Sequence, residues 1–470
     1  MSATATTEKK YLKWYQKLAY GSGDLASNCS YGLVSSFVLL YLTGTLGLDS
    51  AIIGSLMLAS KVLDGISDVI FGTLIDRTHS KLGKARPWML FGQVGVSLCL
   101  FLLFAIPAGS TTMQYIYFFI VYTALNAVFY TANGIAYSSL VALITKNNNE
   151  RVQLGSFRFM FAVVTNIFMG FAVTGMVEQF GSGAAGWRTT ALIFAIVGLV
   201  VNTISCLAVK ELPEEELSDN TCEAAEEGKA VAEEKKHGFA ETAKILIHNK
   251  YYLMILAIYI VYYIMSNLTT GAGVFCATYY WGDGSLLGQF SMMKMFPVII
   301  ALAIAPVLIK KTGSMQKVNF WGYAISSVLG IPMIYFAMQK NLSMFLLFMF
   351  IKGIFAGTLS GSLNALIAEA SGYTTRTTGI HMDGMMYSCS SLGVKVGGGI
   401  GTAAVGWLLK LGGFVGTATV QSESAIRMIF NLYITFPFVI GIIITVLLAF
   451  LDVEKANKKW DAEHQKEAQA

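Results

Sequence analysis

The chain has 470 residues, of which 55% are hydrophobic and only 13% are charged, and its mean hydropathy is +0.59. This composition leaves too little polar surface to cover a soluble globule of this size, so it excludes a soluble enzyme or regulatory domain. The formal net charge of +5 does not indicate nucleic-acid binding, because the basic residues are spread between apolar stretches and form no continuous patch.

Apolar stretches of about twenty residues, long enough to cross a bilayer as helices, occur twelve times. They lie near residues 17–45, 50–75, 88–108, 113–145, 154–178, 187–209, 250–282, 286–309, 317–338, 343–369, 381–411 and 424–451. The sequence therefore predicts an all-α membrane protein with twelve transmembrane helices.

A polar stretch rich in Glu and Lys, from Lys210 to Asn249, separates two groups of six predicted spans. We expect an N-terminal half over 1–209, a linker over 210–249, a C-terminal half over 250–451 and a tail over 452–470. A weak internal repeat supports the two halves, because basic clusters with a Gly follow the second span of each half. These clusters lie in Gly72 to Trp88 and in Pro306 to Lys317.

The basic residues outside the spans predict the topology. In a twelve-span arrangement, the basic N-terminus, the linker and the clusters after spans two, four, eight and twelve fall on one side. The positive-inside rule then places both termini and the linker in the cytoplasm, in a protein integral to the plasma (inner) membrane. The N-terminus lacks the apolar core of a cleavable signal, so we expect the first span to direct insertion. The linker end FAETAKILIH is either an amphipathic surface segment or an ordinary solvated stretch.

Ionisable residues within the spans are few, and such residues commonly mark ion or substrate pathways. They are Asp24, Lys61, Asp64, Asp68, Arg158, Lys294, Lys352, Asp383 and Lys395. Asp64 and Asp68 share one face of a helix because they are four residues apart. Two such carboxylates repel one another unless a cation lies between them.

Oxygen ligands of the type that Na⁺ or H⁺ requires are grouped on span two. Asp64, Ser67 and Asp68 lie on adjoining positions, and Thr131 on span four can add a hydroxyl. Lys395 on span eleven is a candidate counter-charge when the cation is absent. The alternative is that the two acids only form structural ion pairs, with Lys61 and with Lys395.

A candidate substrate site combines Asp24, in a Gly-rich part of span one, with Arg158 near the start of span five. A carboxylate and a guanidinium facing one cavity suit the hydroxyl groups of a sugar. Arg158 can equally extend to the membrane surface. Aromatic residues that can stack on a sugar ring, or simply pack, are Tyr20, Tyr31, Tyr130, Tyr137 and Tyr387.

Four segments resemble one transporter family over nearly the whole chain. They are KVLDGISDVIFGTLIDRTHSKLGKARPW, AYGSGDLASN, ITKNNNERVQLGSFR and SLGVKVGG. They resemble the glycoside-pentoside-hexuronide:cation symporters of the major facilitator superfamily, to which the melibiose permeases belong. The span-two motif is the most specific of the four. The resemblance implies a major facilitator fold of two six-helix halves.

The resemblance also implies roles for individual residues at the cation site. Asp64 and Asp68 match the family's cation-binding acids, Ser67 lies between them, and Thr131 matches a span-four hydroxyl. Lys61 takes the place of a basic residue commonly found three positions before the first acid. Asp64 and Asp68 are then the metal ligands if the coupling ion is Na⁺.

For the substrate, the resemblance implies that Asp24 and Arg158 bind the sugar and that Lys395 links the sugar and cation sites. Asn133 and Tyr137 on span four complete the set of candidate substrate-binding residues.

The chain departs from the family at span four and before span eleven. In TANGIAYSSL the position of the melibiose permeases' second sugar-binding acid is Gly134, a Pro is replaced by Ala136 and a Trp by Ser138. His381 stands where an Arg is usual, while Asp383 is kept. Losing an acid while retaining Arg158 leaves a roomier and more cationic cavity. We therefore expect a glycoside other than a plain α-galactoside, such as a glucuronide or a glycoside with a bulky aglycone.

The leading hypothesis is a monomeric secondary active symporter that takes up a glycoside with Na⁺ or H⁺ by alternating access. Its partners are then the glycoside, a monovalent cation and membrane lipid, with no nucleic acid and no cofactor. Ser67 and Thr131 favour Na⁺, because a metal ion needs several oxygen ligands. Two alternatives are a cation-coupled carrier of an amphipathic solute such as a lysolipid, and a membrane sensor that does not transport. An enzyme is not expected, because no catalytic or nucleotide-binding motif is present.

Overall fold

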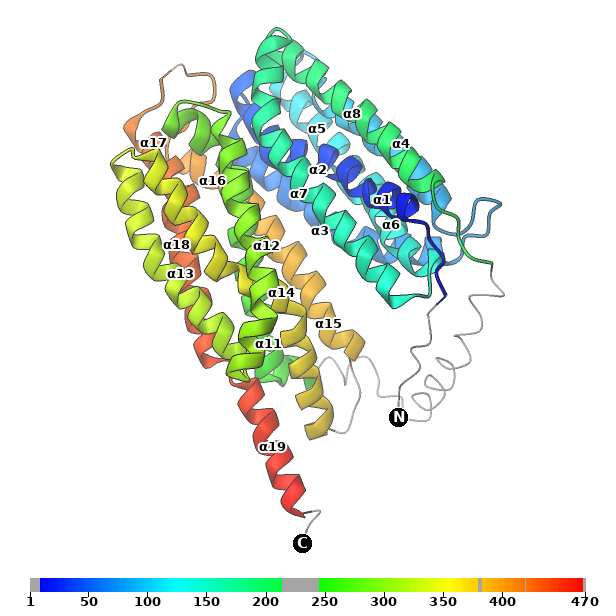
Figure 1. The fold of residues 1–470 in the computed structure, drawn as a ribbon. Helices are drawn as coiled ribbons and strands as arrows, with labels where there is room; N and C mark the ends of the chain where they lie inside the picture. The colour runs from blue at the N-terminus through cyan, green and yellow to red at the C-terminus, as the bar shows by residue number, and fades with distance from the viewer. Residues whose placement is uncertain (1–8, 214–244, 379–382, 419, 468–470) are drawn as a thin grey trace. The chain divides into compact units, whose positions relative to one another are not determined.

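The computed structural model describes residues 9–213, 245–378, 383–418 and 420–467, and the regular structure in these ranges is helical throughout (Figure 1). Within them, eleven helical segments are long and apolar enough to cross a membrane. The remaining predicted span, 50–75, is α3 (Ser50–Asp76), whose 27 residues extend for about 40 Å. The prediction of an all-α, twelve-helix membrane protein is confirmed.

The described residues fall into two compact units, one within residues 1–48 and 59–236 and the other within residues 49–58 and 237–470. The first contains α1 (Trp14–Gly21), α2 (Gly23–Leu40), η1 (Tyr41–Thr45), most of α3, α4 (Arg86–Leu103), α5 (Thr111–Thr123), η2 (Ala124–Tyr130), α6 (Thr131–Ile144), α7 (Asn148–Gln179) and α8 (Gly183–Leu207).

The second unit contains the remaining helices. They are α11 (Lys250–Phe275), η3 (Cys276–Trp281), α12 (Leu286–Thr312), α13 (Met315–Met338), α14 (Leu342–Thr378), α15 (Asp383–Leu392), η4 (Gly393–Gly397), α16 (Gly398–Leu411), α17 (Glu423–Phe430), η5 (Asn431–Thr435), α18 (Phe436–Phe450) and α19 (Val453–Glu467). The segments labelled η are short π-helical stretches. η2, η4 and η5 lie between α-helical segments, whereas η1 and η3 end their helices.

The π-helical turns change the direction of side chains at particular points of the spans. Such turns insert one extra residue per turn and are frequent at functional sites. The η2 turn ends directly before Thr131, and the η4 turn contains Lys395. Both residues were predicted to take part in the site, and each lies in or directly after a π-helical turn.

Several predicted boundaries differ from the structure, and the largest differences are at span five, where α7 begins at Asn148 and not at 154, and at span ten. Span ten was predicted to end at residue 369, but α14 continues to Thr378. The extension is polar yet anchored: Thr374 is buried and accepts a hydrogen bond from Asn249, and Arg376 forms an ion pair with Asp461 of α19 at 3.2 Å. The stretch predicted as a tail after residue 452 contains the helix α19. The predicted amphipathic segment before residue 249 lies mostly outside the described residues.

The N-terminus of α4 is held by a glutamate from the segment that follows α8. The carboxylate of Glu211 accepts hydrogen bonds from the backbone N–H groups of Lys84, Ala85 and Arg86, at 2.7, 3.0 and 3.1 Å. These are N–H groups that a helix start leaves without intrahelical partners, and a negative charge at this end is also favoured by the helix dipole.

The second unit repeats this arrangement at α13. The carboxylate of Glu454, which follows α18, accepts from the backbone N–H groups of Met315 and Gln316 at 2.8 and 3.0 Å and from the hydroxyl of Ser314. In each unit, a glutamate after the sixth span therefore caps the third span. This shared contact gives structural support to the weak sequence repeat between the two loops.

We predict that Glu211→Ala and Glu454→Ala each lower the melting temperature of the purified protein. Each change leaves at least two backbone donors without their acceptor, which costs about 1–3 kcal/mol of stability. Glu178→Ala, at an exposed position near the end of α7, is the control and should leave the melting temperature unchanged. Thermal unfolding in detergent measures the effect, and equal melting temperatures for all three variants would contradict the capping role.

Candidate functional site

An ion pair inside the first unit joins the two residues predicted to bind substrate. Asp24 lies in the first turn of α2, and its Oδ2 is 2.6 Å from Nε of Arg158 on α7. The side chains are 18% and 25% exposed, respectively, so the pair is partly shielded and still accessible. Arg158 therefore points inward to Asp24, and the structure does not support the alternative that it extends to the membrane surface.

Tyr137 on α6 packs against the arginine of this ion pair. The guanidinium carbon of Arg158 lies 4.2 Å from the centre of the Tyr137 ring, within range of a cation–π interaction. The Tyr137 hydroxyl donates to the carbonyl of Tyr20 at 2.8 Å, and the Tyr20 hydroxyl donates back to the carbonyl of Tyr137. A Cβ at Gly23 would come within 2.8 Å of the Tyr137 ring, so glycine is needed for this close approach.

Two asparagines extend the network around Asp24, and the sequence analysis did not identify them. The side-chain amide of Asn28 donates to the backbone carbonyl of Asp24 at 2.7 Å. The side-chain amide of Asn166 on α7 donates to Oδ1 of Asn28 at 2.9 Å. The available signal was their spacing. Asn28 is one turn after Asp24, and Asn166 is eight residues after Arg158, so each shares a helix face with a charged residue.

The second cluster surrounds Asp64 on α3. Its Oδ1 accepts a hydrogen bond from the hydroxyl of Thr131 at 2.7 Å, and its Oδ2 lies 3.5 Å from Nζ of Lys61. Asp64 is 13% exposed and Thr131 is buried. The hydroxyl of Ser67 donates to the Asp64 carbonyl at 2.9 Å, which leaves its oxygen available as an acceptor. Asp68 is half-buried one turn further along α3.

Two stacked aromatic rings, Tyr31 and Tyr130, lie beside the Asp64 cluster. Nζ of Lys61 is 5.9 Å from the centre of the Tyr31 ring, and this ring stacks on Tyr130 with centroids 5.5 Å apart. Tyr31 is seven residues after Asp24 on α2, which corresponds to about 10 Å along one helix face. Tyr130 precedes Tyr137 by the same interval. Thus α2, and likewise the continuous segment formed by η2 and α6, contributes one residue to each cluster.

The side-chain amide of Asn133 forms hydrogen bonds with the neighbouring helix α4. It is 3% exposed, and its amide donates to Oε1 of Gln93 at 2.9 Å and to the carbonyl of Met89 at 3.3 Å, both on α4. This places the side chain in the packing of α6 against α4. Its predicted role in substrate binding stays a prediction. The neighbouring Gly134 has open space where a side chain would begin, with no atom within 4 Å.

Lys395 belongs to the second unit, where η4 packs against α11. A Cβ at Gly397 would lie 2.4 Å from the carbonyl of Ile260, so the two helices approach closely around this lysine. Its predicted link to the acids of α3 stays a prediction. His381 lies outside the described residues, and Asp383 begins α15.

Comparison with known proteins identifies the family. The family model described as MFS/sugar transport protein matches residues 19–455. The isoprimeverose transporter of Lactiplantibacillus pentosus is 26% identical over 98% of this chain and 93% of its own length. Two proteins of Escherichia coli (strain K12) are also similar. The putative glycoside/cation symporter YagG is 24% identical over 94% of this chain and 92% of its own, and a glucuronide carrier protein homolog is 23% identical over 86% and 85%.

Among solved structures, a bacterial homolog of the human lysosomal transporter Spinster superposes with a TM-score of 0.68. It covers 95% of this chain and 98% of its own at 13% identity, which is evidence for the fold alone. The long polytopic chain, the match over 19–455 and the span-two segment agree. The chain belongs to the MFS/sugar transport protein family and, within it, to the glycoside-pentoside-hexuronide:cation symporters, which are transporters and not enzymes.

Proposed function

We propose that the protein is a secondary active symporter that takes up a glycoside together with a monovalent cation by alternating access. The observation that supports this most directly is the hydrogen bond from Thr131 to Asp64, which joins the two spans expected to form the cation site. The relatives named for isoprimeverose, glycosides and glucuronides agree with a sugar substrate. One charge moving through about 100 mV provides about 2.3 kcal/mol for uptake.

The cation site that we propose consists of Asp64, Ser67, Asp68 and Thr131. A charged carboxylate within a membrane span is costly unless it is neutralised, and Lys61 now supplies the positive charge at 3.5 Å. An incoming cation replaces the ammonium group as the counter-charge of Asp64. Several hydroxyl and carboxylate oxygens within one site favour Na⁺ over H⁺, because a proton needs only one carboxylate.

The sugar site that we propose contains Asp24 and Arg158, with Tyr137 holding the guanidinium in place. Partial exposure leaves oxygen acceptors on Asp24 and nitrogen donors on Arg158 for sugar hydroxyls. The open space at Gly134 agrees with a substrate larger than, or different from, a plain α-galactoside. Lys395 is proposed to link the sugar and cation sites. We also propose a monomer in the plasma (inner) membrane with both termini cytoplasmic, from the basic residues of the loops.

We predict that Asp64→Asn and Thr131→Ala weaken cation coupling and retain substrate exchange. Losing a hydrogen bond to a charged group costs about 1.5–3 kcal/mol, so Thr131→Ala should raise the concentration of Na⁺ needed for half-maximal uptake about tenfold or more. Thr131→Ser keeps the hydroxyl and should resemble the wild type. Asp64→Asn should abolish accumulation against a gradient.

The measurements are Na⁺-dependent uptake and counterflow in right-side-out vesicles, with Asp283→Asn, at an exposed loop position, as the control. Uptake that is independent of Na⁺ but stops when the pH gradient is removed would show that the coupling ion is H⁺. Unimpaired accumulation by Asp64→Asn would disprove the cation site.

We predict that Asp24→Asn and Arg158→Lys lose substrate binding but retain the cation response. Arg158 contacts Asp24 through Nε and the Tyr137 ring through its planar guanidinium. The ammonium group of a lysine is not planar, so it cannot make both contacts at once. The substrate Kd should rise about tenfold or more. Binding of labelled glycoside to membranes measures this, with the exposed Arg188→Lys on α8 as the matched control. Normal glycoside binding by Arg158→Lys would show that the sugar lies elsewhere.

We predict that the protein prefers a hexuronide or an aryl glycoside to melibiose, because Gly134 replaces a sugar-binding acid and Arg158 remains. Counterflow with labelled melibiose, a hexuronide and an aryl glycoside compares the three directly. A clear preference for melibiose would contradict the substrate class.

A further inference from the structure

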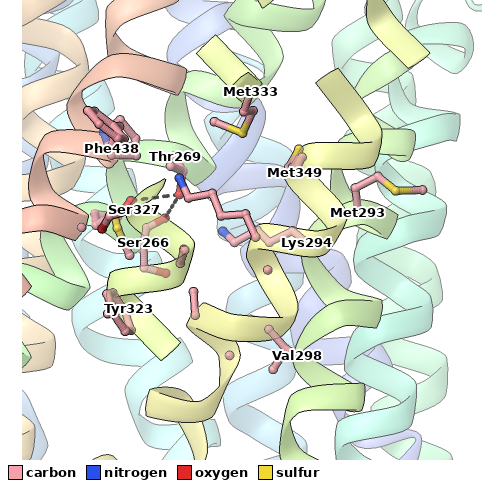
Figure 2. Close-up of a pocket in the computed structure, with 18 of the residues that line it drawn as sticks. Ser266, Thr269, Met293, Lys294, Val298, Tyr323, Ser327, Met333, Met349 and Phe438 are labelled. Atoms are coloured by element: carbon pink, nitrogen blue, oxygen red, sulfur yellow. Dashed lines mark hydrogen bonds between the residues drawn. The ribbon is translucent and has the colours of Figure 1, made fainter. Parts of the chain in front are cut away.

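The second unit contains a partly open cavity of about 190 Å³ lined by α11, α12, α13, α14, η5 and α18 (Figure 2). This is more than ten times the volume of about 10–15 Å³ that a single water requires. Hydroxyl side chains line one part of the cavity, among them Ser266, Thr269 and Ser327, which lie near Lys294 in Figure 2. The cavity therefore has room and hydrogen-bonding groups for a small polar ligand.

Two lysines line this cavity at the same level of neighbouring helices. Lys294 belongs to α12 and Lys352 to α14. The helices touch at Gly353, where a Cβ would lie 2.8 Å from Cβ of Pro297 and 3.6 Å from the carbonyl of Met293. Lys352 directly precedes Gly353, and Lys294 directly follows Met293. Both lysines therefore lie next to this contact between the helices.

Neither lysine has an acidic partner within the described part of the chain. Nζ of Lys294 donates to the hydroxyl of Thr270 at 3.2 Å, while Lys352 has no hydrogen-bond or ion-pair partner in that part. The described residues that line the cavity include no Asp or Glu. Positive charge within a membrane span is costly, and such residues usually pair or mark a substrate pathway. An anion entering the cavity would neutralise this charge.

The remaining walls are apolar and deformable. Four methionines contact the cavity, at 265, 293, 333 and 349, together with Phe345 and Phe438. Methionine side chains adapt to irregular apolar surfaces and make favourable contacts with aromatic rings. The lining thus combines a cationic, hydroxyl-rich part with an apolar part, which suits a ligand that has an acid group attached to an apolar body.

We propose that this cavity is a specificity site in which Lys294 and Lys352 bind the acid group of an anionic glycoside, such as a glucuronide with an apolar aglycone. The inference rests on the proposed function, glycoside transport, and adds the residues that select for an acidic substrate. Two ammonium groups can form charge-assisted hydrogen bonds with one carboxylate, which gives an acidic substrate contacts that a neutral glycoside lacks.

The test uses two ligands that differ only at one carbon: 4-nitrophenyl β-D-glucuronide and 4-nitrophenyl β-D-glucoside. Full-length protein in liposomes of neutral phosphatidylcholine is assayed for binding and uptake of each, which removes anionic lipid as a competitor. The variants are Lys294→Gln and Lys352→Gln, each paired with its charge-conserving Arg variant. Lys310→Gln, in the exposed last turn of α12, is the control.

We expect each Gln variant to raise the Kd for the glucuronide about tenfold or more, with little change for the glucoside and with recovery in the Arg variants. Equal weakening of both ligands, or no change for either, would overturn the proposal. Wild-type protein that transports the glucoside but not the glucuronide would also overturn it while leaving the proposed function intact. If the protein transports neither of these ligands and no other glycoside, the proposed function itself is contradicted.

Discussion

A carboxylate within a membrane-spanning helix is the constraint on which the arrangement of the first unit depends. Each oxygen of Asp64 has its own partner, the Thr131 hydroxyl for Oδ1 and the Lys61 ammonium for Oδ2. Removing either partner takes away a contact that stabilises the charge of Asp64 within the span. The π-helical turn η2, directly before Thr131, places the hydroxyl against α3. The π-helical turn η2 and the carboxylate of Asp64 therefore belong to the same site.

The two polar clusters are connected through shared helices. α2 contributes Asp24 to one cluster and Tyr31 to the other, while Tyr130 and Tyr137 have the same relation at and after the start of α6. The exchange of Lys61 for a cation at Asp64 would act on the Tyr31 and Tyr130 rings, and hence on the helices that position Arg158. Allosteric coupling requires such an element with two arrangements, and these helices are the candidates.

Sequence reasoning was most effective where charge and apolar length coincide. Twelve apolar stretches predicted the spans, because burial of the backbone in lipid permits little besides helices. The rarity of charge in those spans singled out Asp24, Asp64 and Arg158, and the structure pairs each with a partner. The extension of α14 to Thr378 was missed because its last turns are polar and depend on contacts with distant residues.

Uncharged polar residues were harder to assign from the sequence. Asn133 and Asn28 look alike as isolated asparagines in spans, yet Asn133 packs against α4 and Asn28 joins the Asp24 network. Their roles depend on which helix lies opposite, and periodicity along one helix does not encode this. For the same reason, Lys294 and Lys352 were recognised as intramembrane charges, but only the fold places them in one cavity.

The most direct test of the central claim is the dependence of substrate affinity on the coupling cation, measured at equilibrium with purified protein. Linkage requires that the cation and the glycoside raise each other's affinity by the same factor. The account predicts that Na⁺ lowers the Kd of the glycoside, that the glycoside lowers the Kd of Na⁺ equally, and that both effects vanish in Asp64→Asn. A glycoside Kd that is independent of both Na⁺ and pH in the wild-type protein would contradict it.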